Sequence, residues 1–262
     1  MNTLNFFRKG IFALLVAATA LVACSKDSDN NDNGGNGGNG NQPDNPIEVP
    51  KGNYGVLIGE VELTSDNYQK INKDNFPALK SGTVSYDPIN RVLTLDGATI
   101  EATGEKECAI QQPEGTTATL TIVLKNSNTL NSKESVGILV KEASLRITSE
   151  GSLTINTNSR NVSIFIKKGL TIEGGCSIVA NTLIVVYGTL TINRANVYVK
   201  EDGYPAFKSY GEIKLIGCKV VTPEGATEGK YDDFYTFVKD GNFCKEVKIK
   251  KYSEQAGGNI GR

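Results

Sequence analysis

The hydrophobic pattern of the chain is dominated by a short strand-like phrase, in which two aliphatic residues flank one other residue. Six copies occur, at Leu93–Leu95, Leu120–Ile122, Leu145–Ile147, Leu170–Ile172, Leu190–Ile192 and Ile213–Leu215. Their first residues lie 27, 25, 25, 20 and 23 positions apart. A repeat of about 20–30 residues that carries strands and no helical period is typical of a β-solenoid.

Each repeat contains two further apolar segments. After a short bend comes a second aliphatic residue, at Ile100, Leu153, Ile178, Val197 and Val220. A third segment precedes four of the phrases, at 138–140, 164–166, 185–186 and 206–207. Three short strands per turn predict an all-β fold, a right-handed single-stranded parallel β-helix of about six coils. Stacked aliphatic side chains would fill its interior, and neighbouring coils would lie about 4.8 Å apart.

The bends carry small residues in a register of their own. Two residues before each second-strand aliphatic stand Ala98, Gly151, Cys176, Ala195 and Cys218. We interpret them as an inward-facing ladder at a tight corner. Cys176 and Cys218 would then lie two coils, about 9.6 Å, apart, which is too far for a disulfide. Cys108 and Cys244 belong to opposite ends of the stack, so we expect all four thiols to be unbridged.

Both ends of a solenoid need a cover, because an open end exposes apolar side chains and strand edges. Residues 51–90 have this role at the start, with a strand-like segment over 55–63, a helical turn near Tyr68–Ile71 and a strand at 83–86. At the other end an aromatic cluster is expected to plug the last coil, formed by Tyr231, Phe234, Tyr235 and Phe237. A final alternating strand over 244–250 would complete that cover.

The first 50 residues predict a targeting signal followed by a flexible tether. Residues 1–23 have a positive start and a short apolar core, and Leu21-Val22-Ala23-Cys24 has the form of a bacterial lipobox. We expect Cys24 to be lipidated; the alternative is an ordinary secretory peptide. Residues 24–50 are rich in Asn and Gly and predict a disordered tether. The domain would then span 51–252, followed by a frayed tail over 253–262.

The acidic run Ser25–Asp29 resembles the signal that sends lipoproteins to the outer face of the outer membrane in some Gram-negative anaerobes. The alternative is a solvated linker. We therefore expect an outer-membrane, lipid-anchored protein exposed on the cell surface. The membrane would be a partner through the lipid on Cys24, and the domain itself is expected to be monomeric.

Charge and composition exclude several function classes. The formal net charge is −1, and it becomes −3 (26 minus 29) without Arg8 and Lys9 of the first 23 residues. Such a chain has no electrostatic basis for binding nucleic acid. The sequence contains no His, which excludes Ser-His and Cys-His nucleophile systems and the usual zinc sites.

One group of residues suggests a binding surface. Tyr187 and Tyr210 each lie three residues before their phrase, so their rings should stack on adjacent coils. Lys167 occupies the same place one coil earlier, and Tyr204 lies in the long bend before Tyr210. Exposed aromatic rings bind sugar rings by stacking. The alternative is an aromatic stack that merely closes a corner of the helix.

From about Gly55 to Lys250 the chain resembles the "carbohydrate-binding domain-containing" proteins, a pectate-lyase-like parallel β-helix group. The resemblance is carried by Ser81–Asp87 followed by Leu93–Ile100, by the Leu-Thr-Ile coils, and by Val238–Asn242 leading into Val247–Ile249. It implies binding of acidic or plant-type polysaccharides, sometimes with Ca²⁺, and no general enzymatic activity. The bends lack a dense Asp cluster, so we expect no cofactor and no metal.

Three functions remain open at this point. The first is a surface lipoprotein that binds a glycan or another extracellular ligand without catalysis. The second is a polysaccharide lyase or hydrolase. Asp96 and Glu173 would lie about 14 Å apart, too far for a catalytic pair, which leaves Glu150 with Glu173 and Glu201 with Asp202 as open alternatives. The third is a structural or adhesion spacer that binds protein partners. We expect no enzyme and no catalytic residue.

Overall fold

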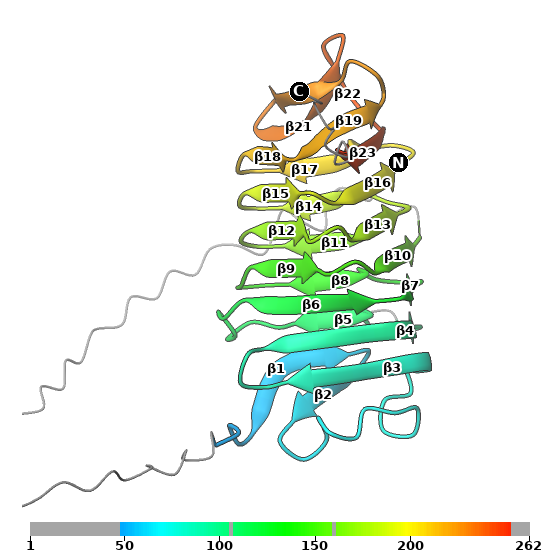
Figure 1. The fold of residues 1–262 in the computed structure, drawn as a ribbon, viewed down its shortest axis with the longest axis vertical. Coiled ribbons are helices and arrows are strands. Elements are labelled where there is room, and N and C mark those ends of the chain that lie inside the picture. The colour runs from blue at the N-terminus through cyan, green and yellow to red at the C-terminus, as the bar shows by residue number, and fades with distance from the viewer. Residues whose placement is uncertain (1–47, 105–106, 159–160, 253–262) are drawn as a thin grey trace, which may run out of the picture. The chain divides into compact units, whose positions relative to one another are not determined.

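The computed structural model describes residues 48–104, 107–158 and 161–252. Within these ranges every regular element is a strand, and stacked parallel strands form a β-solenoid of about five turns (Figure 1). The predicted fold class is therefore confirmed. The described part has no helix that is long and apolar enough to cross a membrane. The predicted signal peptide, Cys24, nearly all of the tether and the tail lie outside the described residues.

The coils have three faces, as the three apolar segments predict. Face 1 consists of the first half of β4 (Val92–Ala102) with β6 (Leu120–Lys125), β9 (Leu145–Thr148), β12 (Leu170–Glu173), β15 (Leu190–Asn193) and β18 (Ile213–Ile216). Face 2 consists of the second half of β4 with β7 (Ser127–Ser132), β10 (Ser152–Thr157), β13 (Ser177–Ala180) and β16 (Asn196–Lys200). Face 3 consists of β5 (Ile110–Gln112), β8 (Ile138–Val140), β11 (Ile164–Ile166), β14 (Ile184–Val186) and β17 (Phe207–Ser209).

The repeated phrase forms the inner wall of face 1. Leu120, Leu145, Leu170, Leu190 and Ile213 pair in parallel from coil to coil, and the second aliphatic of each phrase follows the same register. Nearly all these side chains are buried in one continuous core. Burial of each is worth roughly 1.5–3 kcal/mol, so the stacked phrases are the main source of the stability of the coils.

The number of turns is about five rather than six. Six strands stack on face 1, but the chain returns along face 3 only five times. After β19 (Cys218–Thr222) the chain leaves the solenoid path and forms the antiparallel pair β20 (Thr227–Tyr231) and β21 (Phe234–Lys239). The sixth phrase therefore belongs to an incomplete coil.

The register of the first coil differs from the prediction in two places. Leu93 pairs with Ile122 rather than Leu120, because β6 has a third inward residue, Leu124, which pairs with Leu95. Ala98 is equivalent to Asn128 and Leu153, and Ile100 is equivalent to Leu130. Ala98 therefore does not belong to the small-residue ladder.

The rest of that ladder is confirmed. Gly151, Cys176 and Ala195 occupy equivalent positions, and the Ala195 amide donates to the Cys218 sulfur at 3.4 Å. A Cβ on Gly151 would lie 2.6 Å from the Leu124 carbonyl oxygen. Coils therefore approach so closely at this corner that only small side chains are accommodated.

The N-terminal cap is built from antiparallel strands. β1 (Asn53–Ile58) and β2 (Val61–Thr64) form a hairpin on the edge of β5, and β3 (Leu79–Asp87) pairs with β4. The single strand-like segment predicted over 55–63 is thus two strands, because Gly59 turns the chain with φ of 61°. No helical turn forms at Tyr68–Ile71: the Asn67 side chain bonds the Thr64 amide and the Glu62 carbonyl and holds a turn there.

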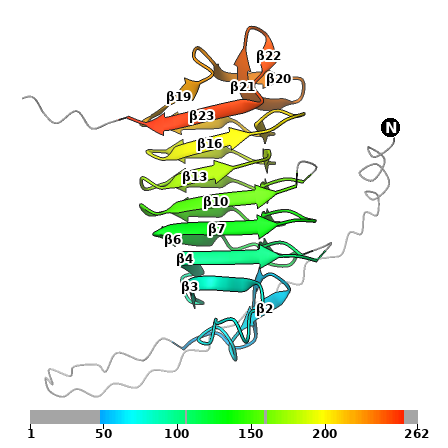
Figure 2. The same cartoon turned by 90° about the vertical axis from the view of Figure 1, so that its right-hand side faces the viewer.

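The C-terminal cap inserts a strand into the stack. β23 (Glu246–Lys251) lies between β16 and β19 and pairs antiparallel with both (Figure 2). β22 (Asn242–Phe243) pairs antiparallel with the end of β21, and β21 also pairs antiparallel with β17. Phe237 is fully buried and packs edge-on against Phe207 at 5.3 Å between ring centroids. The predicted plug and closing strand are both present, but the strand enters the sheet rather than lying over its end.

Candidate functional site

The outer surfaces of the three faces differ in chemistry. Outward positions on faces 1 and 2 hold mainly Thr, Ser, Asn and charged residues. On face 3 each strand has only three residues, and the central one points outward. From β8 to β14 these central residues are Leu139, Phe165 and Val185. Leu139 and Phe165 are partly exposed and Val185 is only 7% exposed, so the middle of face 3 has a small apolar floor, which distinguishes it from the other two faces.

The predicted aromatic stack lies at the edge of this floor. Lys167, Tyr187 and Tyr210 directly follow β11, β14 and β17, and each of their amides donates to the carbonyl that ends the strand one coil below. The rings of Tyr187 and Tyr210 stack with centroids 4.6 Å apart and planes 25° apart. The Lys167 ammonium lies 4.2 Å from the Tyr187 centroid. Three of the four predicted binding residues are thus brought together.

The stack is longer than the sequence predicts. The Phe165 ring lies 5.6 Å from that of Tyr187. At the other end, the Lys208 ammonium lies 5.1 Å from the Tyr210 centroid and 4.6 Å from the Phe234 centroid. We call Phe165, Lys167, Tyr187, Tyr210, Lys208 and Phe234 the aromatic ladder. Among the described residues, neither lysine has a carboxylate within salt-bridge distance.

The arrangement decides which ring surfaces a ligand can reach. One face of Tyr187 is covered by Tyr210, while the opposite face is covered by Lys167, whose side chain is exposed. Tyr187 is 42% exposed. Burial, and then the neighbouring Tyr210, raises the pKa of Tyr187 above its ordinary value. Movement of one flexible lysine would uncover an aromatic face beside an apolar floor.

Tyr204 does not join the ladder. Its side chain is 55% exposed in the bend between β16 and β17, and no aromatic or cationic contact of it is found among the described residues. The sequence placed it near Tyr210 because the two are six positions apart. The bend between them separates the side chains.

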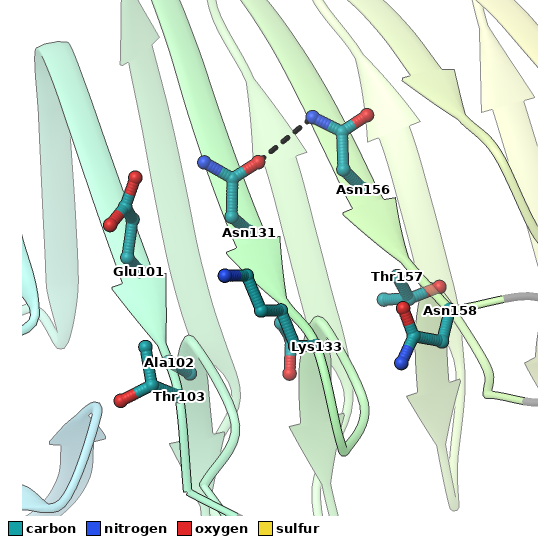
Figure 3. A pocket seen from close by; sticks show the side chains of 9 residues that line it. Glu101, Ala102, Thr103, Asn131, Lys133, Asn156, Thr157 and Asn158 are labelled. Atoms are coloured by element: carbon teal, nitrogen blue, oxygen red, sulfur yellow. Dashed lines mark hydrogen bonds between the residues drawn. The ribbon is translucent and has the colours of Figure 1, made fainter.

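Several hollows in the described part of the protein lie away from the ladder. A groove of about 870 Å³ follows the corner between faces 1 and 2, and both Glu150 and Glu173 line it. Glu173 is ion-paired with Arg146 in this groove. A smaller cleft of about 200 Å³ lies at the end of face 2, lined by Glu101, Asn131 and Asn156 among others (Figure 3).

The second pair of acids that the sequence left open has a structural role. Glu201 is 4% exposed and accepts hydrogen bonds from the amides of Leu183 and Gly203. Its carboxylate therefore joins the bend after β16 to the bend between β13 and β14, one coil below. Asp202 is exposed and does not share this environment.

No family model, curated protein or solved structure matches this chain. The chemistry of the site must therefore be judged from its own residues. The described residues contain no group of three His, Cys, Asp or Glu side chains arranged to hold a metal ion.

Sequence reasoning missed Phe165, Lys208 and Phe234 for different reasons. Phe165 lies in the apolar segment 164–166, whose pattern does not separate inward from outward residues, although a central position in a three-residue strand signals the outside. Lys208 has the equivalent position on β17. Phe234 reaches the ladder only through the antiparallel return of β21 onto β17, which no repeat pattern encodes.

Proposed function

We propose that this protein is a non-catalytic, lipid-anchored surface protein that binds carbohydrate through face 3 of its solenoid. The observation that carries the proposal is the aromatic ladder beside an apolar floor, with two lysines that have no carboxylate partner among the described residues. Sugar rings present apolar C–H faces to aromatic rings and hydroxyl groups to lysine. A ridge of this kind contacts a chain of sugars without enclosing it.

The ladder can be tested with matched tyrosine variants. We expect Tyr187→Ala and Tyr210→Ala each to weaken binding to the glycans that the wild-type chain selects on an array, by about two- to tenfold, because each removes a stacking contact. Tyr204→Ala is the control, since this ring is exposed but lies outside the ladder. Unchanged binding by both ladder variants would remove the site from consideration, and release of product from pectin would contradict the non-catalytic part.

The membrane anchor needs a separate test. Replacement of Cys24 by Ser removes the proposed lipid acceptor, so we expect the protein to move from the membrane fraction to the soluble fraction. Protease treatment of intact cells should degrade the wild-type domain if it faces outward. Survival of the domain in intact cells, with degradation after lysis, would place it on the inner side.

A further inference from the structure

A column of polar side chains crosses face 2 at its far edge. The registers of β4, β7 and β10 align Glu101 with Asn131, and Asn131 with Asn156. Figure 3 shows these three side chains on neighbouring strands, with Lys133 beside Asn131. Together with Thr103 and Asn158 they line the cleft of about 200 Å³.

The cleft presents hydrogen-bonding groups that the described part of the protein does not satisfy. Asn156 Nδ2 donates to Asn131 Oδ1 at 2.9 Å, which leaves the Asn131 amide nitrogen and the Asn156 amide oxygen at the two ends of the pair without a protein partner there. Neither Glu101 nor Lys133 forms a salt bridge with any described residue. A free donor, a free acceptor, a carboxylate and an ammonium therefore face one small space.

The size and charge of the cleft restrict its ligand. Drug-sized pockets measure about 300–1,000 Å³, so a cleft of about 200 Å³ accommodates a single ring. Among the described residues that line it, one acid and one base balance in charge and none is aromatic. Carboxylate and amide groups each offer two neighbouring polar atoms, which match two adjacent hydroxyl groups on a ring.

We propose that this cleft is a second binding site, which takes one neutral hexose unit through adjacent hydroxyl groups. The proposal rests on the proposed function in taking the ligand as a carbohydrate, but its residues are separate from the aromatic ladder. Glu101 and the Asn131–Asn156 pair hold the hydroxyl groups, and Lys133 donates to a ring or glycosidic oxygen.

The two sites border opposite edges of face 3. The cleft is at the corner between faces 2 and 3 on the coils of β4, β7 and β10, and the ladder follows the end of face 3 on the coils of β11, β14 and β17. The coil of β10 and β11 is common to both, and from centre to centre the two sites are about two coils, or about 10 Å, apart along the axis. One oligosaccharide that reaches both sites gains affinity through effective concentration, so longer chains bind more tightly than single sugars.

The test uses the full chain and defined probes. Saturation-transfer NMR measures binding of the methyl glycosides of glucose, galactose and mannose. We expect at least one to bind, and the double variant Asn131→Ala, Asn156→Ala to weaken that binding about tenfold, because two hydrogen-bonding groups are lost. Tyr204→Ala, which lies outside both the cleft and the ladder, is expected to leave it unchanged.

A matched control lies on the same two strands. Ser152 donates to Ser127 at 3.2 Å across β10 and β7, outside the cleft. The double variant Ser127→Ala, Ser152→Ala should bind the glycoside as the wild type does, and circular dichroism should show that both double variants are folded. Absence of binding by all three glycosides, or equal loss in both double variants, would overturn the second site. Loss of long-chain binding in Tyr187→Ala alone would leave the ladder standing without the cleft.

Discussion

At the scale of single residues, Asn128 holds the first coils together. It is only 2% exposed and occupies an inward position that Leu153 and Ile178 fill with aliphatic groups in later coils. Its side-chain oxygen accepts from the Ala98 amide at 2.8 Å, and its nitrogen donates to the carbonyls of Lys125 and Ser152. One amide thus joins three successive coils.

Replacement of Asn128 tests this role. Asn128→Leu restores the aliphatic stack by pattern, yet we expect it to destabilise the domain by about 2–4 kcal/mol. The change leaves buried backbone groups unpaired, and each such group costs about 1–3 kcal/mol. Urea unfolding followed by circular dichroism measures the change. An Asn128→Leu variant as stable as the wild type would show that the hydrogen bonds of the Asn128 side chain are dispensable.

The corner between faces 1 and 2 demands a left-handed backbone in every coil. Positive φ angles occur there at Gly97, Asn126, Ser149, Gly174, Arg194 and Gly217. This conformation costs a residue other than glycine roughly 1–2 kcal/mol. The bend is therefore a backbone requirement, which several side chains tolerate at a cost.

Paired substitutions reveal that cost. We expect Arg194→Gly to leave stability unchanged or to raise it by about 1 kcal/mol, since relief of strain outweighs the added freedom of the unfolded chain. Gly174→Ala should instead destabilise by at least about 1 kcal/mol, because its Cβ would also lie 2.7 Å from Thr148 Oγ1. Thermal unfolding measures both. A stabilising Gly174→Ala would contradict the proposed bend requirement.

The thiols provide a test of the coil register. Cys108, Cys176, Cys218 and Cys244 are buried and free, and burial raises the pKa of Cys176 to about 11. The neutral thiol is favoured in the folded state, so its contribution to stability is present below the unfolded pKa and is lost as pH rises through about 11. We expect the wild type to lose more stability between pH 9 and 11 than Cys176→Ala does.

Thiol titration tests the coil register separately. In denatured, unreduced protein we expect Cys108, Cys176, Cys218 and Cys244 all to react as free thiols. A disulfide between any two of them would contradict the register.

At the scale of elements, β23 closes two strand edges at once. Val247 and Ile249 are fully buried within the core, while Lys248 and Lys250 are exposed. The strand covers the free edge of β16 on one side and of β19 on the other. Uncovered edges of parallel strands associate with other chains, so this strand stabilises the last coil and also protects it.

Two kinds of change in β23 separate its contribution to stability from its protection of the strand edges. We expect Ile249→Ala to destabilise the domain by about 2–5 kcal/mol, as for other buried aliphatic residues, and Lys250→Ala to change stability by less than about 0.5 kcal/mol. A chain that ends before Glu246 should self-associate in light scattering. A monomeric truncated chain would indicate that the edges of β16 and β19 pair directly once β23 is gone.

At the scale of the whole molecule, the absence of His predicts a broad pH plateau. Histidine is the side chain that ordinarily titrates between pH 5 and 8, and the chain has none. The shifted groups move away from neutrality: hydrogen bonds from Asn90 lower the pKa of Asp87, whereas burial raises the pKa of Tyr54, Tyr86 and Cys176.

The lowered pKa of Asp87 sets the acid limit of the plateau, and the raised pKa values of the Tyr and Cys side chains set its alkaline limit. A lowered pKa on Asp87 gives stability that is lost only below the unfolded value of about 3.9, and the raised Tyr and Cys values give stability that is lost only above about pH 8.5–10. We expect the melting temperature and glycan binding to be constant between pH 5.5 and 8. Calorimetry and repeated titrations measure both. A transition near pH 6.5 would contradict the plateau.

The repeat of aliphatic phrases determined most of the fold by itself. Leu145, Leu170 and Leu190 recur at intervals that only a stacked coil can bury, and the small residues at Gly151, Cys176 and Ala195 fix the tight corner. Lys167, Tyr187 and Tyr210 could be aligned from the same interval. Local pattern is sufficient here because each coil contacts mainly its neighbours.

The tertiary structure decided everything that breaks the repeat. The insertion of β23, the return of β21 that brings Phe234 to the ladder, and the two-residue offset of Leu93 all depend on pairings between distant segments. The cleft at Asn131 likewise requires the register of three strands. A periodic sequence specifies a neighbour one coil away, but antiparallel closure and side-chain convergence are set by which edges remain unpaired once the coils have formed.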